Sequence, residues 1–264
     1  MSPPLRREAF LQVLDEAAAI VRRARLSPDA VRIKADGSPV TDIDWDVDLF
    51  LRSELTRLTP DAGWLSEESP DDGSRSSAPR AWIVDPIDGT NELVAGRDEV
   101  AISVALVKRG SVVAAAVVNP LRGERGVWID GEPPRFDGLA ALPAATALSG
   151  ARAIVSRTEA SRGELRGLDG IFADVREVGS VAYKLLRVAA GADHVTYSVK
   201  PKREWDVCGG VGLVRAAGGR VVRLDGVPME FNLADTRIPS GLVAGPPALV
   251  EAAARELRAR LAGR

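Results

Sequence analysis

Residues 82–93 read WIVDPIDGTNEL, and two aspartates, Asp85 and Asp88, follow the apolar run at the start of this stretch. The apolar run predicts a buried β-strand, and Pro86 predicts a turn that brings the second carboxylate to the same point as the first. Two ionised carboxylates held close together repel each other unless a proton or a cation lies between them. Because the ligands are all oxygens, including a backbone carbonyl between the aspartates, the stretch favours Mg²⁺ or Mn²⁺.

The same stretch has other interpretations. Gly89 and Thr90 predict a tight turn into a short helix, whose free N–H groups suit a phosphate oxygen. Without a ligand, Asp85 would cap a turn and Asp88 would cap a helix, both in water. A third interpretation is the nucleophilic aspartate of haloacid dehalogenase-type phosphatases, whose motif is DxDxT. The spacing here, DxxDGT, is one residue longer and argues against that nucleophile.

Length and composition limit the class of protein. The chain has 264 residues, enough for one large domain or two small ones, with 45% hydrophobic and 27% charged residues. Its longest wholly apolar stretch, residues 112–118, is too short to span a bilayer. The start, MSPPLRREAF, lacks the apolar region of a secretory signal, which predicts a cytoplasmic protein. A net charge of −2 gives no electrostatic reason to bind a nucleic acid polymer or an anionic membrane.

Few residues are available for acid–base chemistry. A single cysteine, Cys208, excludes an internal disulfide, and a single histidine, His194, disfavours a histidine-rich zinc site or a histidine-driven triad. Carboxylates, hydroxyls or a bound metal must therefore carry the chemistry.

In the first half, patterns of apolar residues and turn residues predict helices and a hairpin sheet. The helices are expected at residues 5–25, ending before Ser27-Pro28, and at 42–58 with Thr41 as N-cap. The strands are expected from 81–85, from 99–120 as a hairpin, and from 125–131. Residues 34–41 and 69–80 have the composition of loops, and the second is typical of a mobile one.

The second half alternates strands and helices, which predicts an α/β arrangement. Strands are expected at 151–156, 192–199, 220–224 and 241–245, and helices at 180–191, 205–219 and 246–263. Residues 132–149 lack periodicity, so the domain boundary is placed near Gly150. We therefore expect an α+β domain over residues 1–149 and an α/β domain over residues 150–264.

Two other stretches supply carboxylates. WLSEES carries Glu67 and Glu68 behind an apolar pair, and EWDVCGG places Asp206 at the expected start of a helix. Taken alone, the glutamates suggest a solvated surface and Asp206 a helix cap. Together with Asp85 and Asp88 they suggest a metal site.

Five stretches, in this order and spacing, give the chain a specific resemblance to a known family: SPVTDID (38–44), LSEES (65–69), WIVDPIDGT (82–90), GSVAYKLLRVAAG (179–191) and EWDVCGG (204–210). The chain resembles the inositol monophosphatase family of magnesium-dependent, lithium-sensitive phosphomonoesterases. The resemblance implies a layered αβαβα sandwich, with an α+β N-terminal half, an α/β C-terminal half, the active site between them, and a homodimer.

The resemblance also assigns roles to individual residues. It implies two or three Mg²⁺ ions and water as the nucleophile, with no covalent intermediate. The implied metal ligands are Glu67, Asp85, the Ile87 carbonyl, Asp88 and Asp206, and Glu68 is less suited as a ligand than Glu67. The implied catalytic residues are Asp44, Glu67 and Thr90, of which Asp44 and Thr90 position and activate the water. The implied substrate-binding residues are Gly89, Thr90, Gly179, Ser180, Lys200, Lys202 and Arg203.

The resemblance implies that the substrate is a small phosphorylated metabolite, whose identity the family does not determine. Inositol-specific members resemble one another in an acidic residue several positions before WD, where this chain has TYSVKPKREWD. The basic residues Lys200, Lys202 and Arg203 suit a second anionic group. VSRTEASR and DGTNEL resemble stretches of the bisphosphate nucleotidases, although Glu159, Asn91 and Leu93 depart from their pattern.

We therefore favour 3′-phosphoadenosine 5′-phosphate over inositol phosphate or another sugar phosphate such as fructose 1,6-bisphosphate. A catalytically silent binding protein on the same fold is a further, remote alternative, disfavoured because it would not need the full set of catalytic residues. If KPKR is instead a solvated loop, the argument for a second anionic group fails.

Overall fold

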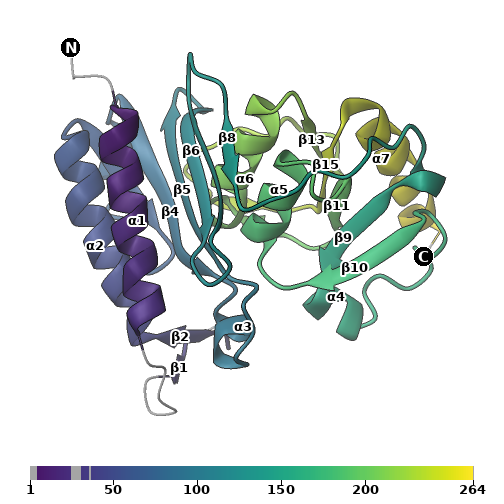
Figure 1. Ribbon diagram of the computed structural model, residues 1–264, viewed down its shortest axis with the longest axis horizontal. Helices are drawn as coiled ribbons and strands as arrows, with labels where there is room; N and C mark the ends of the chain where they lie inside the picture. The colour runs from purple at the N-terminus through teal and green to yellow at the C-terminus, as the bar shows by residue number, and fades with distance from the viewer. Residues whose placement is uncertain (1–4, 25–30, 36, 264) are drawn as a thin grey trace.

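The protein is described by a computed structural model in which residues 5–24, 31–35 and 37–263 are placed. Five layers alternate along its longest axis: two helices, a sheet, two helices, a second sheet and a final helix (Figure 1). The αβαβα sandwich implied by the family resemblance is thereby confirmed.

The first two layers come from the N-terminal half. Helices α1 and α2 cover one face of a six-stranded sheet of order β3-β4-β5-β6-β7-β8, in which β3 and β4 are parallel and the other pairs antiparallel. The bounds are α1 Arg7–Arg23, α2 Asp42–Leu58, β3 Ala62–Ser66, β4 Arg80–Asp88, β5 Ala101–Lys108, β6 Ser111–Asn119, β7 Glu124–Ile129 and β8 Arg135–Asp137. The apolar faces of both helices pack on the sheet in one buried cluster, as their three-to-four spacing requires.

The last two layers come from the C-terminal half. In a five-stranded sheet of order β10-β9-β11-β15-β13, β15 alone runs antiparallel to the other four strands, and α7 packs on this sheet. The bounds are β9 Arg152–Ser156, β10 Asp174–Val178, β11 Val195–Ser198, β13 Arg220–Arg223, β15 Leu242–Gly245 and α7 Pro247–Ala262. Short elements complete the chain: β1 Val31–Ile33, β2 Pro39–Thr41, η2 Ser74–Ser76, α3 Thr90–Val94, η3 Leu148–Gly150, α4 Arg157–Ser161, β12 Lys202–Arg203 and β14 Arg237–Ile238.

The central layer is formed by α5 (Val181–Ala189) and α6 (Glu204–Ala216), which share one core with both sheets. Glycines allow α6 to approach its neighbours closely. A Cβ atom would lie 2.4 Å from Leu185 Cβ at Gly210, and 2.7 Å from Val112 Cγ1 at Gly212. Distances below about 3 Å are incompatible with a side chain there. The backbone of α6 is therefore held against α5 and the first sheet.

Most elements match the sequence predictions within two or three residues. Helix α2 has the predicted bounds, 42–58, because Thr41 and Asp44 form the capping box that begins it. Helix α1 covers 7–23 of the predicted 5–25, and the predicted stop at Ser27-Pro28 lies outside the described residues. The predicted division near Gly150 falls in η3, between the strands of the two sheets, and the two-domain description stays a prediction.

Two local predictions were wrong, and some elements were missed. Strand β4 does not end at Asp85 in a turn but continues through Pro86 to Asp88, with a register shift against β5. Residues 31–33 and 39–41 pair as the hairpin β1-β2, so the described part of the expected loop at 34–41 includes a strand. Strand β10 and helix α4, which interrupt the second half, were not predicted.

The 69–80 segment contacts the C-terminal half through one side chain. The Arg75 side chain is buried, bonds to Asp71 and donates to Asn232 Oδ1 at 2.8 Å and the Leu233 carbonyl at 2.9 Å. These bonds fasten the segment to the C-terminal half.

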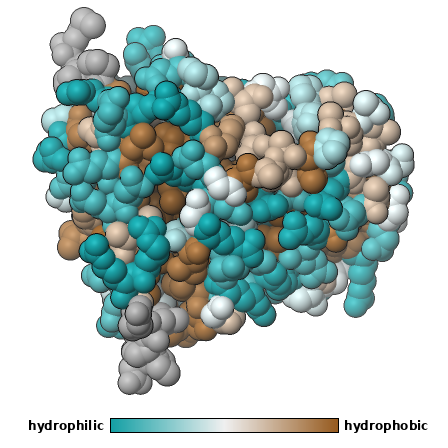
Figure 2. Space-filling view, in the orientation of Figure 1, coloured by the Kyte–Doolittle hydropathy of each residue, from teal (hydrophilic) through white to brown (hydrophobic). Residues whose placement is uncertain are grey.

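Because helices cover the faces of both sheets, we expect a surface of mainly hydrophilic residues with apolar ones between them. On the side seen in Figure 2, hydrophilic residues cover most of the surface and apolar residues form smaller patches between them. Among the described residues, no helix has both the length and the apolar character needed to cross a membrane.

Candidate active site

The end of β4 carries the two aspartates of the DPIDGT motif. Asp85 pairs with Ser103 of β5 and Asp88 with Ala101, so one extra residue lies between the pairs on β4. Pro86 has no N–H to donate to the ladder, which suits it to such a bulge. The bulge leaves Asp85 fully buried and puts Asp88 at the edge of a cavity.

Three carboxylates from separate elements form an acidic cluster, defined as Glu67, Asp85 and Asp206. One oxygen from each lies within 4.8 Å of the others. Glu67 follows β3, Asp85 lies on β4 and Asp206 is in the first turn of α6. The parallel pairing of β3 with β4 brings the first two together, and the close approach of α6 brings the third.

The electrostatics of the acidic cluster fit a bound cation. Burial and then repulsion from the neighbouring carboxylates raise the pKa of Asp85 well above its usual value. Burial and repulsion from Asp88 raise the pKa of Asp206 to about 7. An all-oxygen donor set of this charge is the kind that Mg²⁺ or Mn²⁺ takes in proteins, and a divalent cation would relieve the repulsion. The cluster therefore fits the ion that the sequence implied.

Asp88 is held beside this cluster by the beginning of α5. Its Oδ2 accepts hydrogen bonds from Ser180 Oγ and the Ala182 N–H, each at 2.6 Å. Ser180 adopts a positive φ of 31°, unusual for a residue with a side chain, and its hydroxyl also caps α5 by accepting from the Tyr183 N–H. Such local strain is typical of residues fixed at functional sites.

Asp44 and Thr90 come together as the resemblance implied. The Thr90 hydroxyl lies 2.9 Å from Asp44 Oδ1 and 3.0 Å from the Ile87 carbonyl. The other Asp44 oxygen accepts from both the N–H and the hydroxyl of Thr41, at 2.8 and 2.6 Å. Burial raises the pKa of Asp44, and the hydrogen bonds from Thr41 and Thr90 oppose that rise. Thr90 lines the cavity, so its hydroxyl links the buried carboxylate to the open space.

Lys34, just after β1, contacts the acidic cluster and was not singled out from the sequence. Its ammonium donates to Glu67 Oε1 at 2.6 Å and to Glu68 Oε1 at 2.5 Å. Burial lowers the pKa of Lys34, but the two glutamates outweigh it and hold that pKa above its usual value. Burial raises the pKa of Glu68 to about 7. Lys34 therefore supplies part of the countercharge on the side of Glu67.

A cavity of about 250 Å³ opens in front of these residues. We call it the active-site cavity. It lies where the ends of β4 and β9, the start of α5 and the short helices α3 and α4 meet. Its lining includes Glu67, Ile87, Asp88, Gly89, Thr90, Asn91, Glu92, Ser156, Glu159, Gly179, Ser180, Lys184, Ser198, Lys202 and Asp206.

The glycines of the motifs make room for this cavity. Gly89 has φ of 100° and begins α3, a conformation that L side chains rarely adopt. A Cβ at Gly179 would lie 2.1 Å from Glu92 Cγ, so only glycine fits beside that buried carboxylate. Arg157 holds Glu92 and Glu99 together, each at 2.6 Å from Nη1.

Lys184 is a second basic residue that sequence reasoning missed. It is 2% exposed, and its ammonium donates to the carbonyls of Gly179 and Ser180 at 2.7 and 3.1 Å. Burial lowers its pKa to about 8, although Asp88 raises it. The signal was present in the sequence, since a single lysine interrupts the otherwise apolar helix pattern of VAYKLL.

The three basic residues expected to bind substrate lie in different surroundings. Lys202 lines the active-site cavity, where its ammonium lies 3.0 Å from Glu159 Oε1. Lys200 does not line it and pairs with Glu164 at 3.1 Å. The Arg203 guanidinium lies over the Trp205 ring, outside the lining of the cavity. The structure thus brings Lys202 and Lys184 to the cavity and leaves Lys200 and Arg203 at its periphery.

Comparison with known proteins agrees with this geometry. The inositol monophosphatase family model matches residues 6–262. The chain is 34% identical over 201 residues to inositol-1-monophosphatase of Rhizobium meliloti, covering 72% of this chain and 73% of the relative. It is 31% identical over 207 residues to 3′-phosphoadenosine 5′-phosphate phosphatase of Mycobacterium bovis, covering 76% and 75%.

Solved structures show the same fold. The Thermotoga maritima IMPase superposes with a TM-score of 0.80 at 21% identity, over 97% of this chain and 98% of that one. The family match over nearly the whole chain, and the relatives above 30% identity, lead to one conclusion. This chain belongs to the inositol monophosphatase family of phosphatases.

Proposed function

We propose that the protein is a magnesium-dependent phosphomonoesterase that uses water as the nucleophile. The observation that carries the proposal is the juxtaposition of the acidic cluster, Asp88 and the Asp44–Thr90 pair at one cavity. Two or three Mg²⁺ ions bound by Glu67, Asp85, Asp88, Asp206 and the Ile87 carbonyl would supply a water of lowered pKa and neutralise the phosphoryl oxygens.

The residues of the chain then position the reactants. Asp44 accepts the proton of the Thr90 hydroxyl in a hydrogen bond, so the lone pairs of the threonine oxygen face the cavity and can accept from the attacking water. The N–H groups at Gly89 and Thr90 are proposed to bind the phosphate. Ser180 holds the Asp88 carboxylate in one orientation, which fixes the position of the phosphate site relative to the metal site.

We propose 3′-phosphoadenosine 5′-phosphate as the substrate. Support comes from Lys202 at the cavity and from the positive charge of the buried Lys184 behind its wall, because a second phosphate needs basic groups beyond those that hold the reacting one. The named relatives include a phosphatase for this compound.

A second candidate, inositol phosphate or a related sugar phosphate, is favoured by a different observation. The carboxylate of Glu159 already pairs with Lys202 and bonds to the Ser198 hydroxyl at 2.5 Å. This pairing neutralises Lys202, and Glu92 adds a further carboxylate to the lining. Carboxylates suit the hydroxyl groups of a polyol better than they suit a second phosphate.

The deciding experiment assays 3′-phosphoadenosine 5′-phosphate, inositol 1-phosphate and fructose 1,6-bisphosphate side by side at one Mg²⁺ concentration. We expect the first to have the highest kcat/KM and Li⁺ to inhibit in the millimolar range. A higher kcat/KM for inositol 1-phosphate would establish the alternative instead. If none of the three, and no other phosphomonoester in a broad panel, were hydrolysed, the enzymatic proposal would fail.

Matched lysine variants test the second phosphate directly. Loss of a hydrogen bond to a charged group costs about 1.5–3 kcal/mol, which is about 10-fold or more in affinity. Lys202→Met should therefore raise the KM for the bisphosphate by about 10-fold and change that for inositol 1-phosphate less. Lys200→Met removes the same charge outside the cavity lining and serves as the control. Equal effects of Lys202→Met on both substrates would contradict a second phosphate pocket.

A further inference from the structure

A second and larger cavity, of about 680 Å³, lies at the end of α6 remote from Asp206. The end of α6, strand β13, helix α7 and the 226–230 segment surround it. Five arginines line it, and we call it the arginine cavity: Arg215, Arg220, Arg223, Arg255 and Arg258. It shares no lining residue with the active-site cavity among the residues described.

Only two of the five arginines have a carboxylate partner in the described part of the chain. Arg220 pairs with Glu251, and Arg223 with Asp225. Arg258 donates to the carbonyls of Leu224 and Arg223 instead, each at 2.8 Å.

The other two arginines, Arg215 and Arg255, have fewer polar partners. Arg215 donates to the Met229 carbonyl at 3.0 Å, and Arg255 has no polar partner within residues 5–24, 31–35 and 37–263. Arg215 is an exposed residue, and partial desolvation lowers the pKa of its guanidinium. A guanidinium stays protonated under such conditions, so the cost of its desolvation is relieved by an anion.

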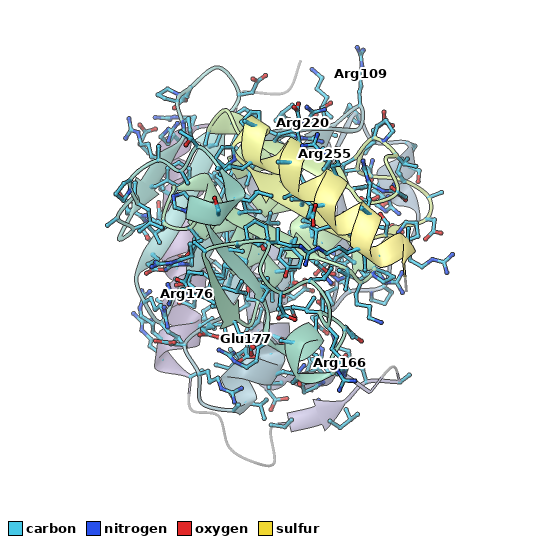
Figure 3. The ribbon with its side chains drawn as sticks, turned by 90° about the vertical axis from the view of Figure 1, so that its right-hand side faces the viewer. Arg109, Arg166, Arg176, Glu177, Arg220 and Arg255 are labelled. Carbon is cyan, nitrogen blue, oxygen red and sulfur yellow. The ribbon has the colours of Figure 1, made fainter. Side chains whose placement is uncertain are left out.

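The lining carries more positive than negative side chains. Five guanidinium groups face two carboxylates, those of Glu230 and Glu251, and Asp225 adds a third next to the lining. Figure 3 shows Arg220 and Arg255 on the same side of the molecule, beside α7, with Arg109 of the neighbouring β5-β6 turn also there. Convergent guanidinium groups with low-dielectric walls attract anions and bind phosphate oxygens in bidentate fashion.

Part of the remaining lining is apolar. Val221 and Met229 are buried in the wall, while Val227 is half exposed. A volume of this size lies within the range of about 300–1,000 Å³ typical of small-molecule sites. The cavity therefore offers charge for phosphate groups and an apolar surface for a ring.

We propose that the arginine cavity is a second ligand site, which binds a nucleotide-sized molecule carrying two or more phosphate groups. The proposal does not depend on the phosphatase activity, because the two cavities have separate linings. Arg255 is expected to contribute most to binding, since its charge is not engaged elsewhere in the described chain.

The test measures binding of ATP to the full-length protein by titration calorimetry at low ionic strength in EDTA. Without divalent cations the acidic cluster repels phosphates, so binding at the active site is suppressed. We expect saturable binding at one site, weakened at least 10-fold by Arg255→Glu and less by Arg255→Lys, which keeps the charge. Arg255 is exposed, and an unchanged Tm will show that each variant folds.

Matched variants separate this site from others. Arg176→Glu makes the same charge change at an exposed residue of β10, and Lys202→Met removes a charge from the active-site cavity; both should retain binding. Inorganic tripolyphosphate should bind more weakly than ATP if the apolar wall contacts the nucleoside. Absence of saturable binding, equal weakening by Arg176→Glu, or loss with Lys202→Met but not with Arg255→Glu would overturn the proposal. Tripolyphosphate binding as tightly as ATP would overturn the role of the apolar wall.

Discussion

The two threonines that bond to Asp44 allow the proposed catalytic role of Thr90 to be separated from its structural one. Thr90 bonds to Asp44 Oδ1 at 2.9 Å, and Thr41 bonds to Oδ2 at 2.6 Å. Thr90 lines the active-site cavity, whereas Thr41 is fully buried outside its lining. The substitutions Thr90→Val and Thr41→Val therefore remove the same group from the same carboxylate, on opposite sides.

The two variants should be very different in turnover, and Thr41→Val should be the less stable. Each loses one hydrogen bond to a charged carboxylate, which should lower the free energy of unfolding by about 1.5–3 kcal/mol, and Thr41→Val also loses the N-cap of α2. Only Thr90→Val removes the hydroxyl that can accept from the attacking water. Because positioned proton acceptors contribute about 10²–10⁴-fold, kcat should fall at least about 100-fold in Thr90→Val. The kcat of Thr41→Val should stay within a few-fold of that of the unsubstituted protein.

The assay is phosphate release at saturating substrate and Mg²⁺, at a temperature well below the Tm of both variants. Thr90→Ser keeps the hydroxyl and should recover most of the lost kcat. If Thr90→Val and Thr41→Val lost turnover to the same extent, the effect would be one of stability or of Asp44 orientation. The assignment of Thr90 to the water would then be refuted.

Three further perturbations have expected outcomes. Asp206→Asn removes one negative charge from the acidic cluster, so turnover and the rise in Tm on adding Mg²⁺ should both be largely lost. The circular dichroism spectrum should be unchanged, and near-normal activity would exclude Asp206 as a metal ligand. The pKa of Lys184 is lowered to about 8, so its positive charge is lost as the pH rises through that value, and the KM for a bisphosphate should increase there more than the KM for inositol 1-phosphate. Parallel pH profiles would argue against an electrostatic contribution of Lys184 to binding of a second phosphate. Arg75→Leu removes the buried guanidinium that bonds to Asn232 and the Leu233 carbonyl, so urea unfolding should show a loss of about 1.5–3 kcal/mol, and a loss below about 0.5 kcal/mol would mean that Arg75 does not anchor its segment.

Elements with strong local signals could be predicted from the sequence. Helix α2 has an N-cap, a capping box and an apolar face within one stretch, and its bounds were predicted correctly. The β5-β6 hairpin has two apolar runs separated by a glycine turn. In both cases the deciding contacts are close in sequence.

Features that depend on distant contacts were missed. The residues around Arg75 have the composition of a loop, yet the Arg75 side chain is buried because Asn232 and Leu233 supply acceptors from the other half of the chain. Lys34 stands 33 residues before Glu67, and neither neighbourhood indicates that the two meet. The sequence also could not distinguish Lys202, at the cavity, from Lys200 two residues before it, because the direction of a side chain in a short connection depends on its tertiary contacts.

The glycines of α6 have a consequence for the order of folding. Three glycines within a 13-residue helix lower its intrinsic stability by about 3 kcal/mol relative to alanine, so α6 is a poor helix until it docks. The close packing at Gly210 and Gly212 then supplies the stability that the isolated helix lacks. Asp206 can join Glu67 and Asp85 only after that docking, so the proposed metal site would be completed late in folding. Bound Mg²⁺ would then slow the dissociation of α6 from its neighbours and the unfolding of the central layer.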